Sequence, residues 1–162
     1  MTNVILHVED EENDVLLFQH AMAKAGVENP VQVAIDGQQA IDYFKGEGKF
    51  ADRAEFPLPR LILLDLKLPF VPGLEVLKWI RRQARLQIAV VVLTSSEDAA
   101  DLAAAYELGA NAYVVKPNEV TKLVDVAKAI KDFWLTLNRP APEPPAVQTP
   151  APPGQLSAKT DR

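Results

Sequence analysis

Short aliphatic runs alternate with longer segments of helical period five times along residues 1–138, and this alternation limits the possible folds more than any other feature. The short runs, which have the lengths and residue types of β-strands, are residues 4–8, 31–35, 61–64, 88–93 and 112–115. The helical segments are residues 13–25, 38–45, 73–84, 98–108 and 119–138. Gly26 and Gly109 stand where the first and fourth helices are expected to end.

The predicted strands are apolar on both faces, which indicates a sheet covered by helices on both sides. Strands that alternate with helices are joined by right-handed parallel crossovers. The sequence therefore predicts an α/β protein with a doubly wound, five-stranded parallel sheet. In such sheets ligands bind beyond the carboxyl ends of the strands, so the residues directly after each strand are the first candidates for a functional site.

Composition and charge exclude several classes of protein. The longest apolar runs are far shorter than the roughly 20 residues that cross a bilayer, so we expect no membrane span. The first residues lack the basic flank and cleavage signal of a secreted protein, so we expect a cytoplasmic location. The chain has no cysteine, which excludes disulfides and thiolate metal sites. Its net charge is −5 and its basic residues are dispersed, so we expect no nucleic-acid binding.

The composition changes after Asn138. Residues 139–162 hold seven of the 13 prolines and only two large aliphatic residues, too little apolar surface to offset the entropy of ordering the segment. We therefore expect a folded domain over residues 1–138 and a proline-rich tail over residues 139–162. A docking strap or a proline-motif ligand is the alternative interpretation of the tail.

Polar residues follow four of the five predicted strands: Glu9, Asp10, Asp65, Thr94 and Lys116. The carboxyl ends of these strands meet at one edge of the sheet, so we expect the side chains to lie together. Three converging carboxylates repel one another unless a hard cation such as Mg²⁺ is bound. Asp65 can form an acyl phosphate by attack on phosphorus. Thr94 and Lys116 can then hold the phosphoryl oxygens.

Each of these signals also has a simpler explanation. An acidic cluster at a helix start stabilises the helix dipole, an aspartate after a strand is a common turn residue, and Thr94 begins a run that can cap a helix. Lys116 can be an ordinary surface charge. These explanations do not predict that all four signals stand at carboxyl ends of different strands. Their common location favours a single site.

Four motifs together resemble the receiver domain of response regulators. They are the acidic pair in VEDE, LILLDLKLP around Asp65, VVLTSS around Thr94, and YVVKP ending at Pro117. The resemblance covers about residues 4–138. It implies a flavodoxin-like fold with the strand order 2-1-3-4-5.

The resemblance implies roles for the acidic residues. Asp65 is then the phosphorylation site. Asp10, Asp65 and the backbone carbonyl of Lys67 bind Mg²⁺, and Glu9 acts through the metal-bound water. The family more often has aspartate where Glu9 stands, and the side chain of Lys67 lies near the path of a water that attacks the phosphoryl group.

It also implies roles for residues of the last two strands. Thr94 and Lys116 contact the phosphoryl oxygens, and Thr94 and Tyr113 match the pair that switches when the domain is phosphorylated. The bond between Lys116 and Pro117 matches the cis peptide of the family.

The chain resembles more closely the single-domain regulators of phytochrome-type histidine kinases. The features that carry this resemblance are VEDEENDVLL, the long connection GEGKFADRAEFPLPR and FWL at residues 133–135. It implies a phosphoacceptor response regulator of a two-component phosphorelay, phosphorylated on Asp65 by a histidine kinase and signalling through protein contacts.

Other functions of this fold fit the residues less well. A flavodoxin-type protein needs a phosphate-binding first loop, and the acidic run at residues 9–12 repels a nucleotide. A haloacid-dehalogenase-type phosphatase has a DxDxT motif after its first strand, which is absent here. We therefore expect no enzyme beyond self-phosphorylation and self-dephosphorylation. A degenerate receiver that only mediates protein contact or dimerisation remains the alternative.

The first and last helices carry apolar residues beyond those that a core requires. In the first helix we expect Leu17, Phe18 and Met22 to face the sheet, which leaves Val15 and Leu16 outside and free to dock a kinase. In the last helix the expected core stripe is Val120, Leu123, Ala127, Ile130, Trp134 and Leu137. The apolar residues outside this stripe are Val124, Val126, Phe133 and Leu135. They predict a homodimer whose contact uses the last helix and the segment around Phe133, Trp134 and Leu135.

Overall fold

The computed structural model describes residues 2–143, and these form a five-stranded parallel sheet with the order β2-β1-β3-β4-β5. The strands are β1 (Ile5–Val8), β2 (Val31–Ala34), β3 (Leu61–Leu64), β4 (Ala89–Thr94) and β5 (Ala112–Val115). All neighbouring strands pair in parallel. The predicted fold class and strand order are confirmed. The predicted tail falls largely on residues 144–162, outside the described part of the chain.

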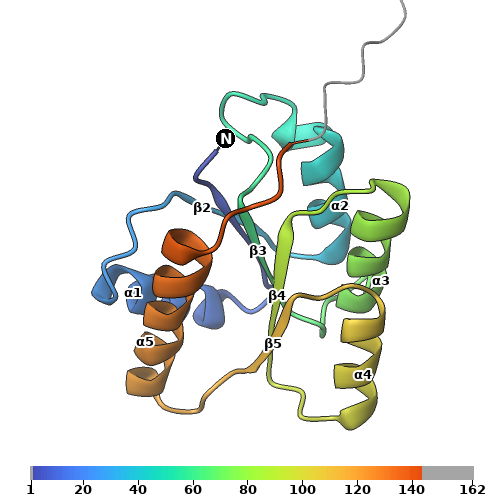
Figure 1. The fold of residues 1–162 in the computed structure, drawn as a ribbon. Helices are drawn as coiled ribbons and strands as arrows, with labels where there is room; N and C mark the ends of the chain where they lie inside the picture. The colour runs from blue at the N-terminus through green and yellow to red at the C-terminus, as the bar shows by residue number, and fades with distance from the viewer. Residues whose placement is uncertain (1, 144–162) are drawn as a thin grey trace, which may run out of the picture.

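Five helices cover the sheet, and Figure 1 shows α1 and α5 on one face with α2, α3 and α4 on the other. They are α1 (Glu12–Lys24), α2 (Gly37–Lys45), α3 (Gly73–Lys78), α4 (Ala99–Glu107) and α5 (Val120–Ala129). Two of them continue as π-helical turns, Trp79–Gln83 after α3 and Ile130–Leu137 after α5. The sequence predicted uninterrupted helices at both places. In the described residues no helix is both long and apolar enough to span a membrane.

Each face of the central strands packs into its own core because successive side chains point to opposite sides. Leu6, Ile62 and Leu64 belong to the cluster under α2, α3 and α4, and Ile5 and Leu63 belong to the cluster under α1 and α5. All five are fully buried. Burying a side chain of this size contributes about 1.5–3 kcal/mol, which explains why these strands are aliphatic throughout.

The long connection before β3 is an ordered loop with its own aromatic packing. It contains a short 3₁₀ helix, Gly48–Phe50. The Phe50 side chain is buried, and its ring centroid lies 5.0 Å from that of Tyr43. The Arg53 guanidinium donates to the carbonyls of Tyr43 and Phe44 at 2.6 and 2.8 Å, two acceptors of the last turn of α2, where helix carbonyls lack intrahelical partners.

The inward face of α1 differs from the prediction. Val15 is buried beside Phe18 and Met22, whereas Leu17 is 42% exposed. Residues 15–18 are all apolar, so the sequence does not determine which of them the helix turns toward the sheet. Leu16 is exposed, as predicted. Of the two predicted kinase-docking residues, therefore, only Leu16 is available.

The inward face of the last helix also differs from the prediction. Ile130 is buried, and Trp134 and Leu135 pack partly buried on the same core, but Leu137 is 71% exposed. The π-helical turns cause this difference. In them a backbone amide donates to the carbonyl five residues earlier, as Asn138 N does to Phe133 O at 2.7 Å. The turn is then wider than in an α-helix, and later residues move off the inward face. Val120, at the start of α5, is exposed as well.

Candidate functional site

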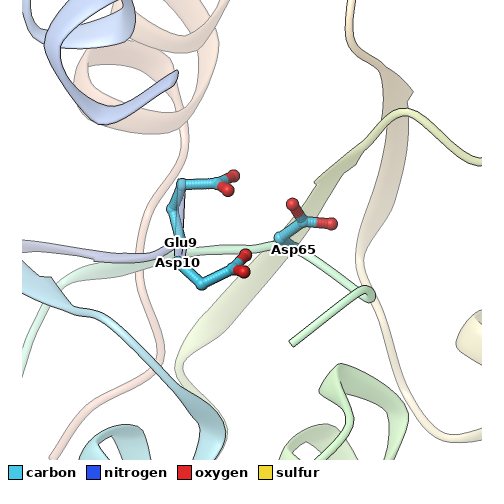
Figure 2. A group of neighbouring side chains, drawn as sticks. All are labelled: Glu9, Asp10 and Asp65. Atoms are coloured by element: carbon cyan, nitrogen blue, oxygen red, sulfur yellow. The ribbon is translucent and has the colours of Figure 1, made fainter. Parts of the chain in front are cut away.

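Three carboxylates meet at the carboxyl edge of the sheet. Glu9 and Asp10 follow β1, and Asp65 follows β3, its neighbour in the sheet. Figure 2 shows the three side chains pointing toward one another, and one carboxylate oxygen of each lies within 4.8 Å of the others. Glu9 and Asp65 are buried, and Asp10 is more exposed than either. The predicted convergence of these residues is confirmed.

Lys116, at the end of β5, reaches across β4 into this cluster. Its ammonium lies 2.5 Å from Glu9 Oε2, 2.9 Å from Asp65 Oδ2 and 3.0 Å from Asp14 Oδ2. Burial by itself lowers the pKa of Lys116, but the hydrogen bonds to Asp65, Glu9 and Asp14 outweigh burial and raise it above its usual value. Lys116 is therefore a fixed positive charge beside Asp65.

The two buried carboxylates differ in their affinity for a proton. Burial and the neighbouring Asp65 raise the pKa of Glu9 to about 7, against the opposing hydrogen bond from Lys116. The pKa of Asp65 is lowered, because hydrogen bonds from Lys116, Glu9 and the Lys67 amide outweigh the effect of burial. The Lys67 amide donates to Asp65 Oδ1 at 3.2 Å. Asp65 is thus the ionised carboxylate of the pair, as a nucleophile requires.

A glycine lets the chain fold back beneath the acidic cluster, and sequence reasoning did not assign it a role. A Cβ atom on Gly73 would lie 2.2 Å from the carbonyl oxygen of Asp65 and 2.6 Å from Cα of Leu66. The Gly73 amide instead donates to the Leu66 carbonyl at 3.1 Å. α3 therefore starts directly under Asp65, and any side chain at Gly73 would displace it.

Ser96 forms hydrogen bonds with both Thr94 and Tyr113. The sequence predicted only a helix cap for the run after Thr94. Thr94 is fully buried at the end of β4, and its hydroxyl accepts a long hydrogen bond of 3.4 Å from the Ser96 amide. The Tyr113 hydroxyl donates to the Ser96 carbonyl at 3.0 Å. The helix cap itself is Asp98, whose side chain accepts from the Ala100 amide.

The prediction of a cis peptide bond is wrong for this structure. Within residues 2–143 all peptide bonds are trans, including the bond between Lys116 and Pro117. Trans is the more stable isomer of such bonds by about 0.5–1 kcal/mol. The Lys116 ammonium reaches Asp65 with the bond in this form, so the contact does not require the cis isomer.

Two further residues near the site were not predicted. Asp14, in the first turn of α1, contacts Lys116, although it lies beyond the acidic run at residues 9–12 from which the site was predicted. His7 is buried on β1 against Phe18, with ring centroids 5.3 Å apart. Burial lowers the pKa of His7 to about 4, so the ring is neutral at physiological pH.

The donor atoms fit a divalent cation that prefers oxygen. The three side chains, Glu9, Asp10 and Asp65, supply only carboxylate oxygens. In this structure the Lys116 ammonium, which contacts Glu9 and Asp65, offsets the repulsion between these carboxylates. Mg²⁺ is commonly held by one or two carboxylates together with water and phosphate oxygens.

Comparison with known proteins identifies the family. Residues 5–128 match the response regulator receiver domain. The chain belongs to this family. It is therefore a receiver-domain response regulator of two-component signalling, a class whose members bind a divalent metal at an acidic pocket and interact with histidine kinases.

Individual relatives cover most of the chain. The probable methanogenesis regulatory protein FilR2 of Methanothrix harundinacea is 40% identical over 84% of this chain and 86% of its own length. Response regulator Rcp1 of Synechocystis is 37% identical over 85% of this chain and 93% of its own, and its Mn²⁺-bound structure has a TM-score of 0.77. The phosphorylated cyanobacterial phytochrome response regulator RcpA is 36% identical, has a TM-score of 0.79, and is matched over 88% of this chain and 100% of its own.

Proposed function

We propose that the protein takes a phosphoryl group onto Asp65 from a histidine kinase and signals through protein contacts. Mg²⁺ is bound by Asp10, Asp65 and the backbone carbonyl of Lys67, and Glu9 acts through the metal-bound water. The observation that carries the proposal is the 2.9 Å contact between the ionised Asp65 carboxylate and the Lys116 ammonium. A nucleophile and a fixed positive charge for the phosphoryl oxygens are thus adjacent.

The transfer step follows from this arrangement. An Asp65 oxygen forms a bond to phosphorus while the bond between phosphorus and the histidine nitrogen of the kinase breaks, and the histidine keeps the electron pair. The Lys116 ammonium can pair with the negative charge of the phosphoryl oxygens during transfer, because it already contacts Asp65 Oδ2. The buried Thr94 hydroxyl accepts from the Ser96 amide through its oxygen, which leaves its O–H able to donate to a phosphoryl oxygen. Mg²⁺ supplies charge neutralisation of the carboxylates and the phosphoryl oxygens.

A phytochrome-type kinase is the partner class that the relatives favour, since RcpA is described as a phytochrome response regulator. Two apolar side chains that follow the acidic residues in the chain are exposed, and a kinase can cover them. Leu16 on α1 is exposed, and Phe70, in the loop that follows Asp65, is 85% exposed. Phe70 also has a positive φ of 65°, a costly backbone for an aromatic residue, which favours a role at this surface.

We also propose a homodimer through the last helix. Phe133 is half exposed and lies edge-on to Trp134, with centroids 4.8 Å apart. These two rings line an open, mostly apolar groove together with Val91, Val114, Asp125, Val126, Ala129 and Ile130. Trp134 and Leu135 both pack partly buried on the core, but only Trp134 also lines this groove, so the contact proposed from the sequence reduces to Phe133 and Trp134.

Phosphotransfer tests the proposed function. Candidate kinases from the same genome are autophosphorylated with labelled phosphate and mixed with the chain in the presence of Mg²⁺. We expect rapid transfer from one kinase to the native chain and none to the Asp65→Asn variant. Binding to a kinase without transfer to the native chain would instead favour a degenerate receiver that mediates protein contact.

A further inference from the structure

A second lysine stands beside the acceptor but faces away from the acidic cluster. Lys67 is two residues past Asp65, and its ammonium lies 3.3 Å from Asp101 Oδ2 in the first turn of α4. Its side chain is 67% exposed, and that of Asp101 is 21% exposed. The pair therefore connects the loop after β3 with α4. Lys116, by contrast, contacts Asp65 together with Glu9 and Asp14.

Asp101 also binds Ser96, the residue that contacts both Thr94 and Tyr113. The same oxygen, Oδ2, accepts a 2.6 Å hydrogen bond from the Ser96 hydroxyl. The Ser96 carbonyl accepts from Tyr113, and the Ser96 amide donates to Thr94. The hydrogen bonds from Ser96 and Lys67 lower the pKa of Asp101, so its carboxylate is charged at neutral pH.

A phosphoryl group on Asp65 would compete for the ammonium of Lys67. The Lys67 amide is bound to Asp65 Oδ1, so the base of this flexible side chain is fixed next to the acceptor. A phosphoryl group offers more negative charge and more acceptor oxygens than one carboxylate oxygen that is already shared with Ser96. The ion pair with Asp101 is exposed and therefore weak, which makes the exchange favourable.

We propose that Asp101 is a positioning residue that holds the Lys67 ammonium on α4 in the unphosphorylated protein, and that a phosphoryl group on Asp65 draws this ammonium away from Asp101. This inference rests on the proposed function of Asp65 as the acceptor. Its consequence is a route from the phosphoryl group to α4 that is separate from the one through Thr94, because it changes the partners of Asp101 directly.

The affinity for beryllofluoride, a non-covalent analogue of the phosphoryl group, tests this competition in the presence of Mg²⁺. Asp101→Asn removes the charge that competes for Lys67 and keeps an oxygen for Ser96, so we expect beryllofluoride to bind about two- to five-fold tighter, the range of an exposed ion pair. Lys67→Gln should weaken binding. In the Lys67→Gln background, Asp101→Asn should have no effect, since the competing group is gone. Glu107→Gln, which removes one charge from the exposed far end of α4, is the matched control and should leave the affinity unchanged.

Isothermal titration calorimetry measures all five proteins under one condition. Unchanged or weaker binding by Asp101→Asn would overturn the inference. An equal increase in beryllofluoride affinity in the Lys67→Gln background or in Glu107→Gln would overturn it too, because the increase would then result from the change in net charge of the protein. If the native chain binds no beryllofluoride in Mg²⁺, the proposed function of Asp65 itself fails, and this result is distinct from the others.

Discussion

The Lys116 ammonium lies 2.9 Å from Asp65 Oδ2 although the two residues are 51 positions apart in the chain and on strands separated by β4. The contact places a fixed cation on the nucleophile before any phosphoryl donor arrives. It also means that Lys116 compensates buried negative charge in the absence of metal. A change in the charge of Lys116, Asp65 or Glu9 therefore changes the electrostatic environment of the other two.

Asp65 should be the only acceptor of a small phosphoryl donor. Incubation with acetyl phosphate and Mg²⁺ is expected to add one phosphoryl group to the native chain and none to Asp65→Asn, because the amide lacks the nucleophilic oxygen. Intact-protein mass spectrometry measures the adduct. Asp14→Asn is the control, since Asp14 contacts Lys116 but has no acceptor role, and it should retain the adduct. An undiminished adduct in Asp65→Asn would show that the acceptor is elsewhere.

The affinity for Mg²⁺ should rise with pH around neutrality. The pKa of Glu9 is raised to about 7, so below this pH Glu9 carries a proton that opposes a cation, and above it the carboxylate is charged. Calorimetry at about pH 6 and pH 8, one unit on either side of that pKa, should give weaker binding and greater proton release at the lower pH. Glu9→Gln should remove most of the difference. A pH-independent affinity in the native chain would contradict the role of Glu9.

Direct ligation should make Asp10 more important than Glu9. We expect Asp10→Ala to weaken Mg²⁺ binding and phosphorylation more than Glu9→Ala does, if Glu9 acts only through a metal-bound water. Titration with Mg²⁺ followed by acetyl phosphate measures both effects. The reverse order of severity would identify Glu9 as the direct ligand.

Removing Lys116 should destabilise the metal-free protein. Glu9 is fully buried and Lys116 is 16% exposed, so Lys116→Ala leaves buried carboxylates without their cation. We expect a loss of about 2–4 kcal/mol in the free energy of unfolding, somewhat less than for a fully buried pair. Mg²⁺ should restore part of it because it supplies the missing positive charge. Urea unfolding with and without Mg²⁺ provides the measurement, with the exposed Lys122→Ala as control. Equal stability of both variants would refute the compensation.

Self-association should depend on Phe133. Burying the exposed half of this ring would contribute about 0.7–1.5 kcal/mol per subunit, half of the value for a fully exposed ring, so a micromolar dimer also needs burial of the adjoining groove to offset the cost of association. Sedimentation at several concentrations should show a dimer for the native chain and a monomer for Phe133→Asp. Leu137→Asp, an equally polar change at an exposed position of the same helix outside the groove, should still dimerise. A native chain that stays monomeric at about 100 μM, far above the micromolar range expected from burial and association cost, would exclude the dimer.

The strands, the order of the helices and the polar residues at the strand ends could be predicted from the sequence. These are local properties: an aliphatic run such as Leu61–Leu64 must be buried on both faces, and Asp65 directly follows it. Parallel connectivity then brings the strand ends to one edge, so the meeting of Glu9, Asp10, Asp65 and Lys116 was predictable without coordinates.

The tertiary structure alone decided features that depend on how the elements pack. Four consecutive apolar residues in α1 allowed several helix orientations, and contact with the sheet selected Val15 over Leu17. The π-helical turns after α5 moved Leu137 outward and Leu135 inward, and no local pattern marks such turns. The contact of Lys67 with Asp101 joins residues 34 positions apart, and it exists because α4 packs beside the loop after β3. These features depend on packing between segments that are distant in the chain, so the residues of one segment alone do not predict them.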